Sequence, residues 1–170
     1  MKIRVLIQVI LITLAIHSAG YADSNDKRLW RGAELGMTPA QILKVFPDAQ
    51  KNPNPDGVEL TKSASYVIIP STRISSIDFK VSFFFNATGL VQVTLHSKPT
   101  INAYLKQLVG LLHGKYRKPV TIDSNSCYDI IEWYADKLSI SAHTEYSPCY
   151  DNSSVIIIYG YSRYDAMNSL

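Results

Sequence analysis

Two stretches in the middle of the chain alternate between apolar and polar side chains, and they constrain the fold more than any other feature. From Ile77 to Phe85 and from Leu90 to His96 the odd-numbered positions are apolar, and the even-numbered ones are polar except for Phe84 and Leu90. Alternation of this kind is typical of β-strands with one buried face. Residues 86–89 (Asn-Ala-Thr-Gly) lie between the two stretches and suit a turn. The pattern predicts an antiparallel hairpin that is dry on one side.

Two helices are predicted around this hairpin. Residues 37–46 begin with Thr38 as an N-cap, Pro39 at the first helical position and Gln41 three residues after the cap, which together form a capping box. A second helix is predicted from about residue 100 to residue 116, before Pro119. Its apolar stripe comprises Ile101, Tyr104, Leu105, Leu108, Leu111, Leu112 and Tyr116.

Further strands are predicted before and after the second helix. Residues 65–69 form a short apolar run that we expect to end at Pro70. Residues 128–134 and 138–146 form a second hairpin around the turn 135–137. Residues 155–161 form an apolar run that suits a strand buried on both faces, or a central strand of the sheet.

These elements predict an α+β fold, with an antiparallel sheet and two helices packed on its apolar face. Helix and strands follow one another twice, in halves of about 30–97 and 98–161, which predicts an approximate tandem repeat. We expect one α+β domain over residues 23–170.

The first 22 residues have the three parts of a secretory signal peptide. Lys2 and Arg4 form a basic end, an apolar run extends to Ile16, and Gly20-Tyr21-Ala22 suits a cleavage site. The pattern predicts a signal peptide over residues 1–22, and a periplasmic or secreted protein. An uncleaved anchor is the alternative, although the run is short for a membrane span.

The charge of the exported part argues against some partners. Loss of Lys2 and Arg4 from the 17 basic residues would leave 15, against 14 acidic residues. The remaining basic residues are scattered, so no nucleic-acid partner is predicted. We also expect no stable membrane insertion after signal cleavage, and no cofactor.

The chain has two cysteines, Cys127 and Cys149. In an oxidising compartment such a pair predicts a disulfide. The turn at residues 135–137 would place residue 127 opposite a position near residue 145. Two free thiols or an intermolecular bridge are the alternatives. No histidine or cysteine lies at ligand spacing from either one, so no metal site is predicted.

Three residues are the best candidates for catalysis. His96 and His143 fall on polar strand faces, and Glu145 shares the face of His143. If the strands were neighbours, these side chains could form a metal or acid–base site. Solvated side chains on a wet face are the alternative interpretation, and no nucleophile motif or phosphate loop accompanies them.

Tyrosines are concentrated in the last part of the chain. Tyrosine is enriched at interfaces, so an exposed patch on the second half could bind a protein or a glycan. The alternative is that these residues pair across strands as sheet formers. The predicted interaction surface comprises Tyr128, Tyr134, Tyr146, Tyr150, Tyr159 and Tyr161.

Several segments resemble a type of small secreted bacterial protein. They are Trp30, Leu35–Gln41, Phe85–Leu90, Tyr116–Pro119 and Glu132-Trp133. The arrangement over residues 30–161 is similar to the folds of the β-lactamase-inhibitory protein and of small outer-membrane assembly lipoproteins. The chain departs from the pattern in lacking a lipid-anchor cysteine and in having Arg31-Gly32 after Trp30. The resemblance implies a binding or envelope role and carries over no catalytic residue.

The function predicted from the sequence is binding without catalysis. We expect a secreted or periplasmic protein that binds another macromolecule in the cell envelope, a protein or alternatively a glycan. One alternative is a small secreted hydrolase that uses His143 and Glu145. The other is a structural assembly factor of the envelope.

Overall fold

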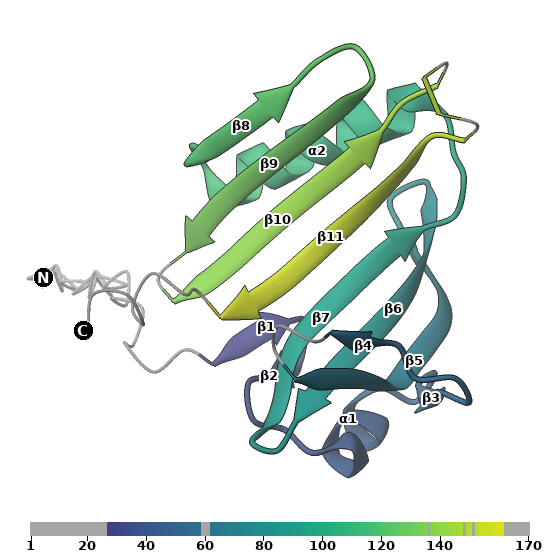
Figure 1. Cartoon of the computed structure of the whole chain (residues 1–170), viewed down its shortest axis with the longest axis vertical. Coiled ribbons are helices and arrows are strands. Elements are labelled where there is room, and N and C mark those ends of the chain that lie inside the picture. The colour runs from purple at the N-terminus through teal and green to yellow at the C-terminus, as the bar shows by residue number, and fades with distance from the viewer. Residues whose placement is uncertain (1–26, 59–61, 136, 148, 151, 162–170) are drawn as a thin grey trace, which may run out of the picture.

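The computed structural model describes residues 27–58, 62–135, 137–147, 149–150 and 152–161, so the predicted signal peptide lies outside the described residues (Figure 1). The elements are β1 (Arg28–Trp30), β2 (Ala33–Glu34), α1 (Pro39–Val45), β3 (Gln50–Lys51), β4 (Gly57–Val58), β5 (Ser63–Ile74), β6 (Ile77–Asn86), β7 (Gly89–Ser97), α2 (Asn102–Tyr116), β8 (Thr121–Ser124), β9 (Tyr128–Ala135), β10 (Leu138–Glu145) and β11 (Ser154–Tyr161).

The fold is α+β with an antiparallel sheet, as predicted. The sheet has the strand order β3-β5-β6-β7-β11-β10-β9-β8, β4 also pairs with β5, and β1 and β2 form a small separate sheet. Each helix precedes a meander, β5-β6-β7 after α1 and β9-β10-β11 after α2. The last strands of the two meanders, β7 and β11, pair with each other and join the halves into one sheet. The prediction that residues 155–161 form a central strand is therefore confirmed.

Both helices pack on the same face of the sheet. A row of buried residues crosses this face from β6 to β9, namely Phe83, Val93, Tyr159, Ile140 and Trp133. After α1, the ring of Phe46 lies 5.2 Å from that of Phe83. On α2, the ring of His113 lies 5.3 Å from that of Trp133. One continuous core therefore joins the two halves.

The start of α1 confirms the predicted capping box. The Thr38 hydroxyl accepts a hydrogen bond from the Gln41 backbone N–H, and the Gln41 side chain accepts one from the Thr38 N–H. Two N–H groups that the helix leaves unpaired are thereby satisfied.

The predicted apolar stripe of α2 is partly wrong. Leu105, Leu108 and Leu112 are buried, together with Val109. Ile101, Tyr104 and Leu111 are 58%, 40% and 54% exposed. A single helix lying on a sheet buries a narrow stripe, and Tyr104 and Leu111 lie at its margins, whereas Ile101 is the N-cap residue before the first turn.

The strand that contains Pro70 is longer than predicted. β5 continues through Pro70 to Ile74, and its register with β6 shifts between Ile69 and Thr72. β3 pairs with β5 only at Val67 and Ile68, so the edge of β5 that faces away from β6 has no partner strand at Pro70 among the described residues. A proline that lacks an N–H is tolerated at such an edge with an irregularity in the ladder.

The predicted disulfide is present. Cys127 and Cys149 are bonded, and their Cα atoms lie 5.3 Å apart. The Tyr146 N–H donates to the Cys127 carbonyl, so residue 127 lies opposite residue 146, one position from the predicted register. The Cys149 N–H donates to the Tyr146 carbonyl, and this turn brings the chain back toward Cys127.

None of the helices in the described ranges is both long enough and apolar enough to span a membrane.

Candidate functional site

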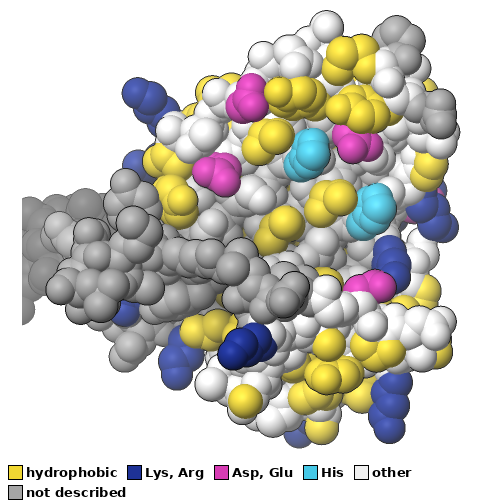
Figure 2. All heavy atoms as spheres, viewed as in Figure 1, with side chains coloured by type: hydrophobic (Ala, Val, Ile, Leu, Met, Phe, Trp, Pro, Cys, Tyr) yellow, Lys and Arg dark blue, Asp and Glu magenta, His cyan; other side chains and the backbone are white. Residues whose placement is uncertain are grey.

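The sheet has a second face, opposite α1 and α2, which we call the open face. Its side chains alternate with the buried ones along each strand, and Figure 2 views the molecule from this side, with α2 behind the sheet in the same view of Figure 1. Hydrophobic, histidine and acidic side chains lie interspersed there. The apolar members on β9 and β11 are Tyr128, Ile130, Tyr134, Ile156 and Ile158.

The open face carries both predicted histidines, but not as neighbours. The cross-strand register places Ile130 opposite His143, His143 opposite Ile156, and Ile156 opposite His96. β11 therefore lies between the strands of the two histidines. A shared site of His96, His143 and Glu145 required that their strands, β7 and β10, be neighbours. These two strands do not pair. Within the described residues no group of three or more His, Cys, Asp or Glu side chains could hold a metal ion.

Glu145 and His96 instead line a shallow hollow on the open face, of about 520 Å³. Lys80, Lys98 and Tyr150 also line it. The Ser154 hydroxyl donates to the Glu145 carboxylate at 3.3 Å, across the β10–β11 pair. The hollow is thus polar and charged, and it belongs to the open face.

The six tyrosines of the predicted interaction surface do not lie together. Tyr128 and Tyr134 lie on the open face, and Tyr150 is 37% exposed in the loop after β10. Tyr146 and Tyr159 are 4% and 5% exposed, so they do not belong to an exposed surface. Both lie on the helix side, because they alternate in step with buried residues of β10 and β11. Tyr161 is the last residue of β11, and the structure does not describe its side chain.

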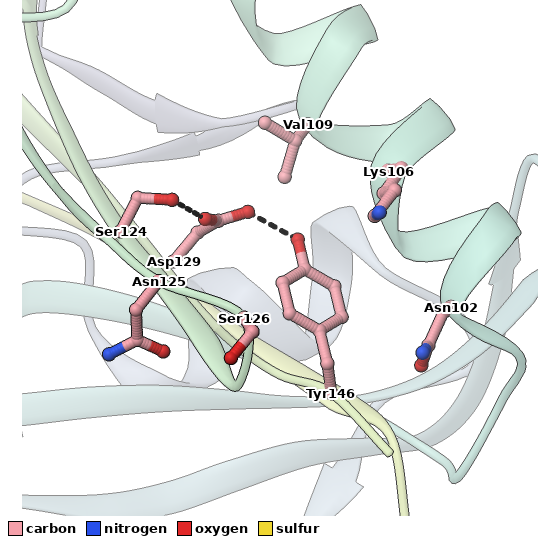
Figure 3. A pocket seen from close by; sticks show the side chains of 8 residues that line it. All are labelled: Asn102, Lys106, Val109, Ser124, Asn125, Ser126, Asp129 and Tyr146. Carbon is pink, nitrogen blue, oxygen red and sulfur yellow. Dashed lines mark hydrogen bonds between the residues drawn. The ribbon is translucent and has the colours of Figure 1, made fainter. Parts of the chain in front are cut away.

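A second concave site, which we call the Asp129 pocket, lies on the helix side of the sheet (Figure 3). It has a volume of about 330 Å³. One wall comes from α2, and the other from the end of β8, the loop to β9 and the start of β9. It is lined by Asn102, Lys106, Val109, Ser124, Asn125, Ser126, Asp129 and Tyr146.

Asp129 is the centre of this pocket. Its carboxylate accepts hydrogen bonds from the Ser124 hydroxyl and from the Tyr146 hydroxyl, one on each oxygen. The Lys106 ammonium lies 5.7 Å from the centroid of the Tyr146 ring. The loop wall is held by the disulfide and by the Asn125 side chain, which accepts hydrogen bonds from the backbone N–H groups of Cys127 and Tyr128.

Several tyrosines are held in the neutral form. Burial raises the pKa of Tyr146 to about 12, and the hydrogen bond to Asp129 contributes. Burial also raises the pKa of Tyr159, with a further contribution from Tyr116. The negative charge of Asp123 raises the pKa of Tyr128 on the open face. The phenols of Tyr128 and Tyr146 donate hydrogen bonds to Asp123 and Asp129, and their raised pKa values extend the neutral form to more alkaline pH than in a free tyrosine.

The Tyr146 pKa predicts a loss of stability at alkaline pH. An unfolded tyrosine ionises near pH 10, so the stability that Tyr146 contributes is complete below pH 10 and is lost as the pH rises to about 12. We expect Tyr146→Phe to make the fall in melting temperature between pH 10 and 12 shallower than in the parent protein. Circular dichroism melts across this range measure it, with Tyr104→Phe on the outside of α2 as control. If the melting temperature fell equally steeply with pH in the parent and in Tyr146→Phe, the alkaline loss of stability would not come from Tyr146.

The alternation of β9 contains a signal for the Asp129 pocket. Asp129 has the same strand parity as Ile131 and Trp133, which are buried at 4% and 0% exposure. A carboxylate at a core-facing position needs hydrogen-bond partners or an opposite charge. Such a residue is a candidate for a site, although its partners, Ser124 at the end of β8 and Tyr146 after β10, follow from the fold alone.

Comparison of the chain with protein-family models, curated proteins and solved structures finds no match. The resemblance to the β-lactamase-inhibitory protein and to small assembly lipoproteins stays a prediction.

Proposed function

We propose that this chain is a non-catalytic exported protein that binds another protein in the cell envelope through the open face of its sheet. The observation that carries the proposal is the set of apolar side chains on this face, Tyr128, Ile130, Tyr134, Ile156 and Ile158. None of the described helices covers them, because both helices pack on the other side.

The composition of the open face suits recognition of a folded surface. Protein interfaces combine aromatic and aliphatic side chains with polar groups at their margin. Here the apolar residues of β9 and β11 alternate with the polar residues of β10, among them Ser141 and His143. The paired strands hold these side chains in fixed register, so little conformational freedom is lost on binding.

The proposal is tested by a pair of matched double variants. Ile156→Ser with Ile158→Ser removes two aliphatic side chains from the open face, and Ile101→Ser with Leu111→Ser removes two from the exposed surface at α2. Each tagged protein is used to capture partners from an envelope extract of its source, after melting curves have shown that it is folded. We expect one protein to be recovered with the parent chain and with the α2 variant, and at least about tenfold less with the open-face variant.

Two results would count against the proposal. Recovery of no protein in stoichiometric amount would contradict binding to another protein. Equal recovery with both double variants would show that the open face is not the binding surface.

A further inference from the structure

We propose that the Asp129 pocket binds a small zwitterion, a molecule with one ammonium group and one carboxylate, such as a free amino acid. The pocket lies on the side of the sheet opposite the open face, so this inference does not depend on the proposed function. Its volume of about 330 Å³ lies within the range of small-molecule sites.

One wall of the pocket presents a carboxylate with unused capacity. Each oxygen of Asp129 accepts one hydrogen bond from the protein, from Ser124 or from Tyr146. An ionised carboxylate has about four lone-pair sites, so about two remain for a ligand. Among the described residues, no lysine or arginine lies within ion-pair distance of Asp129. An ammonium group would supply both the missing donors and the missing charge.

The opposite wall presents a cation. Lys106 lies on α2 and directs its ammonium toward the Tyr146 ring, away from ion-pair contact with Asp129 (Figure 3). Since an ammonium has three donors, it can bind the carboxylate of a ligand whose ammonium lies at Asp129. Val109 lies on the α2 wall, above the Tyr146 hydroxyl in the view of Figure 3, and offers an apolar contact. The charges of the two walls are thus complementary to a dipolar molecule, and a ligand with a single charge would satisfy only one of them.

The test compares two zwitterions, which differ in the separation of their charges, with ligands that carry one charge. The folded, disulfide-bonded protein is titrated with L-alanine, 5-aminopentanoate, propylamine and propionate, and binding is followed by NMR shifts of the Asn125 and Ser126 amides and by the melting temperature. We expect at least one zwitterion to shift these amides and raise the melting temperature, with at least about tenfold higher affinity than the amine or the carboxylate. The better of the two zwitterions reports the separation of the charges that fits the pocket.

Variants assign the binding to the two walls. Lys106→Met, which replaces an exposed side chain, should weaken zwitterion binding at least about tenfold, whereas Lys115→Met on the same helix should leave it unchanged. Asp129→Asn should abolish binding, provided that this variant folds. If Asp129→Asn does not fold, Lys106→Met alone decides the test. If neither zwitterion shifted the amide signals or the melting temperature, the proposal would be overturned. An ion pair between Lys106 and Asp129 in solution would give this result. Equal affinity for propylamine or propionate, or unchanged affinity in Lys106→Met, would also overturn the proposal.

Discussion

Replacing Trp133 by alanine is expected to lower the free energy of unfolding by about 3–5 kcal/mol. Trp133 is fully buried in the second half of β9, and its ring packs against those of His113 and Tyr116 on α2. The substitution removes the largest fully buried side chain of the core and leaves a cavity between the sheet and the helix, which rigid neighbours fill only in part. Denaturant unfolding followed by circular dichroism measures the loss.

The matched control is Tyr104→Ala, an aromatic residue on α2 that is 40% exposed. We expect it to change the free energy of unfolding by no more than about 1 kcal/mol, because a surface substitution removes few contacts. The comparison also tests the corrected stripe of α2, in which Tyr104 lies at the margin. A loss from Tyr104→Ala as large as that from Trp133→Ala would mean that α2 lies on the sheet in a different rotation.

The second large effect concerns the disulfide. Replacing both Cys127 and Cys149 by serine is expected to lower the free energy of unfolding by about 3 kcal/mol, because the bond closes a loop with a sequence separation of 22 and restricts the unfolded chain. Denaturant melts of the oxidised protein and of the double variant give the difference.

Thiol titration provides the independent check. The denatured, unreduced monomer should show no reactive thiol, and two per chain would contradict the bond. Since Cys127 directly follows the loop wall of the Asp129 pocket, amide signals of Asn125 and Ser126 should also shift in the serine variant. Unchanged signals would show that the loop is held without the disulfide.

Much of the local structure could be predicted from the chain because its causes are local. The alternation around Phe83 specifies which side of β6 is buried, since successive strand residues point to opposite faces. The capping box at Thr38 and Gln41 needs only residues three apart. The offset of Cys127 and Cys149 across the second hairpin follows from the position of its turn.

The buried tyrosines show where the sequence pattern was informative and where it was not. Tyr146 has the parity of Ile140 and Ala142, so the alternation of β10 already indicated that it faces the core. Tyr159 lies in an uninterrupted apolar strand, and there the side that faces the helices cannot be read from periodicity. The tertiary structure assigned it to the helix side, where it packs against Tyr116.

The sequence by itself therefore determined the α+β class, the hairpins, the α1 cap and the cysteine pair, because each depends on residues close in the chain or on strand alternation. The order of the strands was decided by tertiary structure, since pairing of β7 with β11 joins residues about 60 positions apart and depends on how the two meanders share one core. That pairing inserts β11 between the strands of His96 and His143 and so separates these two histidines, whereas Glu145 still lines the same hollow as His96. The Asp129 pocket likewise exists only because α2, β8 and β9 meet at one corner of the fold, where the side chains of Lys106 and Asp129 face the same space.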